Sequence, residues 1–369
     1  MTLMGPPVSL LGVLPRAVTV RSEASVYVAD TLNHRVWVMD GATREVALFA
    51  GTGVARFCGD GRIATLACLR EPWGVVVDEM RRRLLIADAA NNRVRYVSFD
   101  TSIMLTLAGN GAAVSSGDSG EARAASILTP RGVLATDDGV IFVAESGAHK
   151  LRRIAANGII TTIAGIGTRG FRAGTWPATS AQLNNPSHLA MSPNGATLYI
   201  ADTDNFAVRA LTLSTGILAT HAGNGSYGWT PDGMQASQAA FTRVLGIAVD
   251  AQGIIYFSDS GYGVLDSNGG NNCVRTVDPS GTLRTAVGRC KVFPHAYVEG
   301  SQATSVLLDE PCGLAFAPGS RRLHIASYGH NAVRLVTLPA LPIPTKTPTC
   351  TPLVTRSRSR SRKVKRLAV

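Results

Sequence analysis

The sequence of 369 residues lacks any run of about 18 or more uncharged apolar residues, the length that a membrane-spanning helix needs. Its first residues, MTLMGPPVSLLGVLPRAV, have no basic start and carry prolines within the apolar stretch, so they match a secretory signal peptide poorly. We therefore expect a soluble protein without a transmembrane segment. The sequence does not identify its compartment.

Several motifs that carry chemistry are also missing. Six cysteines occur without a CxxC pair, so the common zinc-site spacings are absent, and neither GxxxxGK[ST] nor HExxH is found. In an oxidising compartment the cysteines could form local pairs, Cys58 with Cys68 and Cys290 with Cys312. In a reducing compartment they would be buried or surface thiols.

Positive charge is scarce in most of the chain and concentrated at its end. The net charge is +11, and residues 340–369 hold eight basic residues and no acidic one, which leaves 11 − 8 = +3 for residues 1–339. This Thr/Pro-rich and then Arg/Ser-rich tail, residues 339–369, cannot bury enough apolar surface to fold, so we predict that it is disordered. Its basic patch could bind nucleic acid or acidic lipid, or have no function. The patch consists of Arg356, Arg358, Arg360, Arg362, Lys363, Lys365 and Arg366.

What the sequence does contain is one pattern repeated six times. It reads VYVADTLNHRVWVMD from Val26, LLIADAANNRVRYVS from Leu84, IFVAESGAHKLRRI from Ile141, LYIADTDNFAVRAL from Leu198, IYFSDSGYG from Ile255 and LHIASYGHNAVRLV from Leu323. Each unit contains four short runs of strand length and no long helical pattern; in the second unit the runs are 74–78, 84–88, 93–98 and 104–108. Six units of four strands predict an all-β, six-bladed β-propeller over residues 1–338.

Connecting segments between the copies share a second pattern. The combined pattern AGxG…GDGxxAxxAxL…PxGVxVD…LYIADxxNxRVRxV, clearest in residues 48–97, resembles the NHL-repeat family of six-bladed propellers from about residue 10 to residue 338. The sixth unit lacks its outer strand, so we predict that residues 8–12 supply the fourth strand of the last blade. The GxG sequences are expected to form tight turns, because no helix follows them to bind a phosphate.

Within each copy, an acidic residue ends one strand and a basic residue starts the next, five positions later. The pairs Asp30/Arg35, Asp88/Arg93 and Glu145/Lys150 should therefore face each other across a hairpin as structural pairs. Asn33, Asn92 and Asn205 are predicted to adopt left-handed backbone conformations in these hairpins.

In a propeller of this order, the hairpins and the connections between blades emerge on one face. Loop residues there are candidates for binding, although several could instead pack between blades. The candidates are Asn33, His34, Arg56, Phe57, Asn92, His149, Phe171, Trp176, Tyr227, Trp229, Tyr262 and Phe293. They predict a non-catalytic, monomeric scaffold that binds a protein or peptide and needs no cofactor.

Two alternatives remain open. Asp60, Asp118, Asp232 and Glu299 recur in the connections, where they either stabilise turns or form a ring of acids for Ca²⁺. A Ca or Zn hydrolase or lyase with its site in the central tunnel is one alternative, and His34 and His149 occupy matching positions. The resemblance also includes RNA-binding propellers, a role that the basic tail could assist and that the nearly neutral body argues against.

Overall fold

The structure is a computed structural model of the chain, and it describes residues 8–9, 12–22, 25–261, 270–291 and 302–339. The chain divides after Leu338 into two units, and the description below concerns the first. The basic patch of the tail, Tyr262, Phe293 and Glu299 lie outside the described residues.

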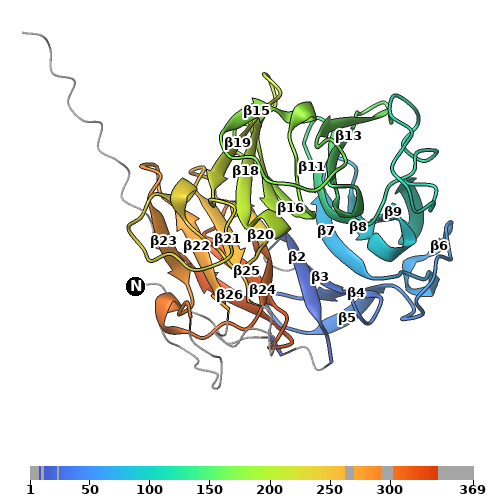
Figure 1. Cartoon of the computed structure of the whole chain (residues 1–369). Coiled ribbons are helices and arrows are strands. Elements are labelled where there is room, and N and C mark those ends of the chain that lie inside the picture. Colours follow the sequence, from blue (N-terminus) through green and yellow to red (C-terminus); the bar gives the residue numbers. More distant parts are fainter. Residues whose placement is uncertain (1–7, 10–11, 23–24, 262–269, 292–301, 340–369) are drawn as a thin grey trace, which may run out of the picture. The chain divides into compact units, whose positions relative to one another are not determined.

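Six antiparallel sheets follow one another around a ring (Figure 1). From the inside outwards each sheet contains strands a, b, c and d. The a strands are β2 (Pro15–Ser22), β7 (Pro72–Asp78), β11 (Pro130–Ala135), β16 (Pro186–Met191), β20 (Val244–Val249) and β24 (Pro311–Phe316). The b strands are β3 (Ser25–Asp30), β8 (Arg83–Asp88), β12 (Ile141–Glu145), β17 (Thr197–Asp202), β21 (Ile255–Asp259) and β25 (Arg322–Ser327).

Strands c and d complete the blades. The c strands are β4 (Arg35–Met39), β9 (Arg93–Ser98), β13 (Lys150–Ile154), β18 (Ala207–Thr212), β22 (Cys273–Val277) and β26 (Ala332–Thr337). The d strands are β5 (Val46–Ala50), β10 (Ile103–Ala108), β14 (Ile160–Ala164), β19 (Ile217–Ala222), β23 (Leu283–Val287) and β1 (Val8–Ser9). Two short strands extend the second and fourth blades at their outer edges, β6 (Arg62–Ile63) and β15 (Thr175–Pro177).

Within the described residues the only helices are single 3₁₀ turns. Four lie in the connections between blades: η1 (Ala64–Leu66), η4 (Ala178–Ser180), η6 (Ala236–Gln238) and η7 (Ala303–Ser305). Three lie in the hairpins between strands b and c: η2 (Ala89–Asn91), η3 (Ser146–Ala148) and η5 (Thr203–Asn205). Among the described residues no helix has the length and apolar character needed to cross a bilayer. The prediction of an all-β propeller with four strands per blade is confirmed, and the strands of the second unit begin within two residues of the predicted positions.

The ring is closed by strands from opposite ends of the sequence. Val8 and Ser9 of β1 pair with Val333 and Ala332 of β26, so the N-terminal strand completes the last blade as predicted. Strand β2 also packs against β24, and Figure 1 shows the first blade beside the last. Backbone hydrogen bonds in the last blade thus join the two ends of the propeller.

Small residues let the innermost strands approach one another around the ring axis. A Cβ atom at Gly74 would lie 2.2 Å from the carbonyl oxygen of Arg131, and one at Gly246 would lie 2.1 Å from that of Cys312. Side chains therefore cannot fit at these positions. The core is instead formed by apolar side chains between successive blades, such as the cluster of Tyr27, Leu84 and Met104.

Deleting residues 1–13 should lower the melting temperature of the protein by many degrees, because it removes β1 and exposes the edge of β26. Thermal unfolding followed by circular dichroism measures the effect. An unchanged melting temperature would show that the pairing of β1 with β26 does not stabilise the ring.

Candidate functional site

One face of the propeller carries the hairpins between strands b and c together with the connections from strand d to the next strand a; we call it the loop face. The two kinds of segment meet because strands a and b are antiparallel, so the end of b lies beside the start of a. The face is therefore built from segments of every blade.

The predicted hairpin pairs lie opposite each other in the strand register, but their charges do not pair. Asp30, Asp88 and Glu145 are the register partners of Arg35, Arg93 and Lys150. The ion partner of the carboxylate is instead the arginine seven positions after it. The pairs are Asp88–Arg95 at 3.5 Å, Glu145–Arg152 at 3.0 Å and Asp202–Arg209 at 3.3 Å. The predicted pairs thus face each other across the hairpin, and within the described residues none of them forms an ion pair within 4 Å.

These carboxylate–arginine pairs are buried. The side chains of Asp88 and Arg95 are 0% exposed, and so are those of Asp202 and Arg209. In the first blade Trp37 takes the place of the arginine, and its indole Nε1 donates to Asp30 at 2.9 Å. Every one of these carboxylates therefore receives a donor from the middle of strand c.

Each carboxylate also binds the start of its own blade. One oxygen accepts the backbone N–H of the residue two positions before the innermost strand begins, from Arg70 to Asp88 at 2.7 Å and from Asn184 to Asp202 at 2.7 Å. The other oxygen accepts a hydrogen bond from an asparagine three positions on, from Asn91 at 2.8 Å and from Asn205 at 2.8 Å. Carboxylate, asparagine and arginine form a unit that we call the Asp–Asn–Arg unit.

This role corrects the prediction of left-handed conformations at Asn33 and Asn205. The left-handed residue of the hairpin is Asn92 in the second blade, as predicted, and is His34 and Phe206 in the first and fourth. Asn33 instead donates to both oxygens of Asp30 and to the carbonyl of Gly12.

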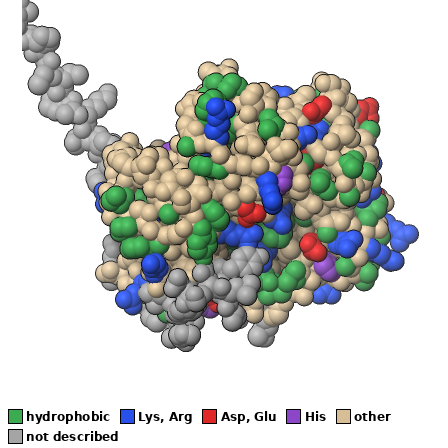
Figure 2. Space-filling model, in the orientation of Figure 1, with side chains coloured by type: hydrophobic (Ala, Val, Ile, Leu, Met, Phe, Trp, Pro, Cys, Tyr) green, Lys and Arg blue, Asp and Glu red, His purple; other side chains and the backbone are tan. Residues whose placement is uncertain are grey.

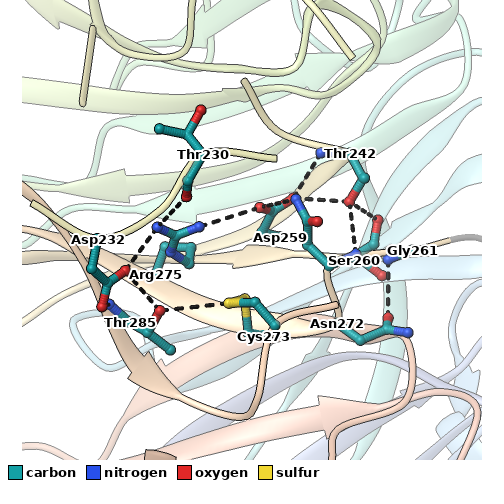
Figure 3. Close-up of a disulfide and its surroundings, with 12 residues drawn as sticks. Thr230, Asp232, Thr242, Asp259, Ser260, Gly261, Asn272, Cys273, Arg275 and Thr285 are labelled. Atoms are coloured by element: carbon teal, nitrogen blue, oxygen red, sulfur yellow. Dashed lines mark hydrogen bonds and ion pairs between the residues drawn. A yellow bond between two sulfur atoms is a disulfide. The ribbon is translucent and has the colours of Figure 1, made fainter. Parts of the chain in front are cut away.

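The arginine of each unit reaches the connection between blades on its other side. Arg95 binds Asp60 at 2.7 Å, Arg152 binds Asp118 at 2.8 Å, and Arg275 binds Asp232 at 3.0 Å. Figure 3 shows Arg275 lying between Asp259 and Asp232. The recurring acids of the connections therefore hold these segments in place, as turn-stabilising residues would. Within the described parts of the chain no three His, Cys, Asp or Glu side chains gather as a metal site requires.

Burial affects the acidity of these carboxyl groups. Burial raises the pKa of Asp88 to about 6, against hydrogen bonds from Arg70, Asn91 and Arg95 that favour the charged form. Burial likewise raises the pKa of Asp202 to about 6. Both groups are therefore still mainly ionised at pH 7, and their charge has to be balanced by the buried arginines.

The left-handed hairpin residues link each blade to the next. His34 accepts the backbone N–H of Glu71 on Nδ1 at 3.2 Å, and His149 accepts that of Asn185 at 3.0 Å. Asn92 accepts the N–H of Thr129 at 2.9 Å through its side-chain oxygen. The matching positions of the two histidines thus reflect a shared hydrogen bond between blades, and burial lowers the pKa of His149, which keeps the ring neutral and able to accept.

Side chains at the start of strand c pack on the second glycine of each GxG turn. Arg35 donates to the carbonyl of Thr52 at 3.2 Å and Arg93 to that of Asn110 at 2.7 Å. A Cβ atom at Gly53 or Gly111 would lie 2.5 Å or 2.2 Å from these guanidinium groups. At the first glycine of the turn the neighbour is backbone, because a Cβ atom at Gly51 or Gly109 would lie 2.4 Å from the carbonyl oxygen of His34 or Asn92, so the close approach to the hairpin requires glycine there.

The fifth blade replaces this contact with a covalent bond. Cys273 stands where Arg93 stands in the second blade, Cys290 stands in place of the second glycine, and the two form a disulfide. The Cys58–Cys68 disulfide is present as expected, but Cys290 pairs with Cys273 and leaves Cys312 as a buried thiol. The correct pairing follows from aligning the copies of the repeat, a signal that distance along the chain does not give.

The candidate aromatic residues are placed differently from one another. Phe57 stacks on Arg93 at 3.8 Å, and Phe171 fills the space above Gly225, where Ala207 replaces the basic residue. Trp176 belongs to β15 on the outer edge of the fourth blade, which is a correction to its assignment to the loop face. Arg56 is exposed in the first connection.

Tyr227 and Trp229 remain exposed on the loop face, at 54% and 39%. Together with Lys291, which lies 5.1 Å from the Trp229 ring, they line a pocket of about 270 Å³. Its floor contains Thr242 and Asn271 from the Asp–Asn–Arg unit of the fifth blade. This is the aromatic pocket.

Sequence reasoning missed a stacked row of side chains at the start of the innermost strands. The Arg16 guanidinium lies 3.7 Å from the Tyr328 ring and 5.2 Å from the Trp73 ring, and Arg131 lies 4.2 Å from Trp73 on its own side. Figure 2 shows basic side chains gathered near the middle of the displayed face, where the innermost strands converge in Figure 1. Arg16, Trp73 and Arg131 are each the second residue of the innermost strand in the first three blades, whereas Tyr328 follows β25. Their residue types differ, so the repeat pattern does not reveal the row.

No protein-family model matches the sequence. A stretch of 201 residues is 31% identical to the chloroplastic protein SUPPRESSOR OF QUENCHING 1 of Arabidopsis thaliana, covering 52% of this chain and 18% of that protein. Teneurin-1 of Mus musculus is 26% identical over 258 residues, covering 65% and 9%. NHL repeat-containing protein 2 of Gallus gallus is 36% identical over 82 residues, covering 22% and 11%. The chain thus spans only 9% to 18% of the length of these relatives.

Solved structures with the same fold are more distant in sequence. A protein of unknown function from Bacteroides thetaiotaomicron has a TM-score of 0.62 at 15% identity, covering 90% of this chain and 72% of that chain. A gluconolactonase from Xanthomonas campestris has a TM-score of 0.55 at 16% identity, covering 91% and 98%. A virginiamycin B lyase from Staphylococcus aureus has a TM-score of 0.53 at 12% identity, covering 92% and 100%. At these identities the likeness shows the fold alone.

The class of protein is thus a six-bladed β-propeller whose blades carry a repeated carboxylate–arginine unit. Its repeat pattern resembles NHL repeats, and part of the chain is similar to NHL repeat-containing protein 2.

Replacing Arg152 with methionine should lower the free energy of unfolding by about 3–5 kcal/mol, because Glu145 would stay buried without its cation. The adjacent Arg153 is the matched control. In the described residues it has no carboxylate within 4 Å, so Arg153→Met should change the free energy by less than about 1 kcal/mol. Urea unfolding of both variants measures the two values. Equal losses would contradict the structural role of the unit.

Proposed function

We propose that this propeller is a non-catalytic platform that binds a protein or peptide partner on its loop face and needs no cofactor. The observation that carries the proposal is the aromatic pocket, where two large aromatic side chains stay exposed on a face otherwise held rigid.

Rigidity of the loop face supports a binding role. The connections are tied to the blades by buried arginines, by backbone N–H bonds to the carboxylates and by two disulfides. Segments that are held in place lose little conformational entropy when a partner binds. The described segments of the loop face, which exclude residues 262–269 and 292–301, therefore present their side chains in one fixed arrangement.

Chemistry of the aromatic pocket favours a peptide segment as its ligand. Tyr227 and Trp229 offer large apolar surfaces with few rotatable bonds, which is typical of interface hot spots. Lys291 beside Trp229 adds a positive charge, and the basic residues Arg35, Arg93 and Lys150 have no carboxylate within 4 Å in the described residues. The pocket of about 270 Å³ has room for one side chain of a partner.

Two of the solved structures with the same fold are a gluconolactonase and a virginiamycin B lyase. These enzymatic activities belong to those proteins and are not part of the function proposed here. The carboxylates that sequence reasoning considered for Ca²⁺, Asp60, Asp118 and Asp232, are each bound to a buried arginine. Binding of nucleic acid by the tail stays a prediction.

Selection from a peptide library displayed on phage tests the proposal. Peptides enriched on the immobilised protein should lose about tenfold or more of their affinity for Trp229→Ala, because truncation of a hot-spot aromatic costs at least about 1.4–2 kcal/mol. Met80→Ala is the control, since Met80 is 60% exposed in a hairpin of the opposite face. Enriched peptides that respond to Met80→Ala and not to Trp229→Ala would overturn the assignment of the loop face.

A further inference from the structure

A large cavity lies between the third and fourth blades, away from the loop face. It has a volume of about 930 Å³ and is bordered by the turn after β11, the turn after β16 and the turn after β18. These turns join strands a to b or c to d, so the cavity opens on the face opposite the hairpins. We call it the inter-blade groove.

One part of its wall is apolar and consists of Val140, Phe142, Ile163, Met191, Leu211 and Leu213. Polar and charged side chains line the rest: Thr136, Asp137, Asp138, Arg153, Thr162, Thr179, Ser192 and Asn194. A cavity of this volume that combines an apolar wall with polar groups is typical of small-molecule sites.

A comparison with the interface between the first two blades explains why the groove exists. Tyr27, Phe49 and Phe99 fill that interface, with ring centroids 4.8 Å apart for Tyr27–Phe49 and 5.7 Å for Tyr27–Phe99. The strand registers place Phe142 and Ile163 at the positions of Tyr27 and Phe49. Leu213 follows β18 as Phe99 follows β9. Two of the three rings are thus replaced by smaller aliphatic side chains.

The interface between the first two blades also contains an ion pair that the inter-blade groove does not have at the matching positions. At the first interface, Arg21 extends over the Phe99 ring at 4.1 Å and pairs with Glu79 at 2.7 Å. The residue at the position of Arg21 in the third blade is Thr136, and the residue at the position of Glu79 in the fourth is Pro193. Both changes shorten the side chains at the mouth of the groove.

The groove contains a cation at a position where the first interface has an apolar residue. Arg153 lines it and stands opposite Phe142, where the first blade has Val38 opposite Tyr27. Within the described part of the chain no carboxylate lies within 4 Å of its guanidinium. Asp138 also lines the groove, and its Oδ1 accepts hydrogen bonds from the Thr136 hydroxyl and the Val140 N–H. The hydrogen bond from Thr136 and, to a smaller extent, the charge of Arg153 lower the pKa of Asp138, so Arg153 and Asp138 interact beyond 4 Å. Asp137 is the remaining carboxylate of the lining.

We propose that the inter-blade groove binds a small molecule with an apolar body and one carboxylate, with the body between Phe142, Ile163 and Leu213 and the carboxylate on Arg153. A guanidinium presents paired N–H donors that match a carboxylate in two parallel hydrogen bonds. The apolar walls bury the rest of the ligand. This site is independent of the loop face and of its peptide partner.

A series of eight-carbon ligands tests the proposal on the full-length protein. Octanoate, octylamine and octanol share one apolar body and differ in the charge of the head group. Ligand-observed NMR titration should give octanoate an affinity about tenfold or more above that of octylamine, because a hydrogen-bonded charge pair contributes about 1.5–3 kcal/mol. Arg153→Gln should remove this difference and leave octanol binding unchanged.

Filling variants copy side chains that the chain already uses elsewhere. Leu213→Phe and Ile163→Phe restore the rings found at Phe99 and Phe49, so each should fold and should weaken the binding of octanoate and octanol about tenfold or more. Leu107→Phe is the matched control, because Leu107 holds the position of Ile163 between the second and third blades. It should leave octanoate binding unchanged, and thermal melts check that each variant is folded.

Three results would overturn the proposal: no octanoate binding to the native protein, equal binding of octanoate and octylamine, or octanoate binding that survives both filling variants. If a filling variant fails to fold, Arg153→Gln alone decides, since loss of octanoate selectivity supports the site and retained selectivity contradicts it. Loss of peptide binding by Trp229→Ala has no bearing on these outcomes, so the two proposals fail separately.

Discussion

The buried pairing of a carboxylate at the end of one strand with an arginine in the middle of the next is the interaction on which the loop face depends. Asp88–Arg95 and Asp202–Arg209 place full charges where neither side chain is exposed. Burial alone would be costly, and the cost is offset because each carboxylate also accepts hydrogen bonds from an asparagine and from the backbone ahead of the innermost strand. One unit thereby joins three segments of a blade to the connection that precedes the blade in the chain.

Copies of the repeat show how one structural requirement is met by different chemistry. In each of these blades the start of strand c is packed against the connection that leads to the next blade. Arg93 packs on a glycine of that connection, Phe171 fills the same space beside Ala207 in the fourth blade, and Cys273 forms a disulfide with Cys290 in the fifth. In the first blade Trp37 replaces the arginine as donor to the carboxylate. The blades that depart from the repeat pattern therefore keep the contacts of the fold while changing the residues that make them.

Period and strand length in the sequence were sufficient to predict the six blades, the four strands of each and the closing role of residues 8 and 9, because these features follow from spacing. Partner choice within the hairpins could not be predicted in the same way. Arg93 and Arg95 are two positions apart on the same face of strand c, and both lie over the Phe57 ring, so strand alternation does not tell which of them pairs with Asp88. The stacked row of Arg16, Trp73 and Arg131 and the inter-blade groove depend on contacts between blades, which a single copy of the repeat does not contain.

Amide hydrogen exchange at the residues ahead of the innermost strands tests the central claim most directly. The backbone N–H groups of Arg70, Leu128, Asn184 and Thr242 each donate to a buried carboxylate. If the Asp–Asn–Arg units hold the loop face, these four amides should exchange with a free energy close to that of global unfolding, although they lie in connecting segments. Exchange through local opening, at the low free energies typical of surface loops, would contradict the account.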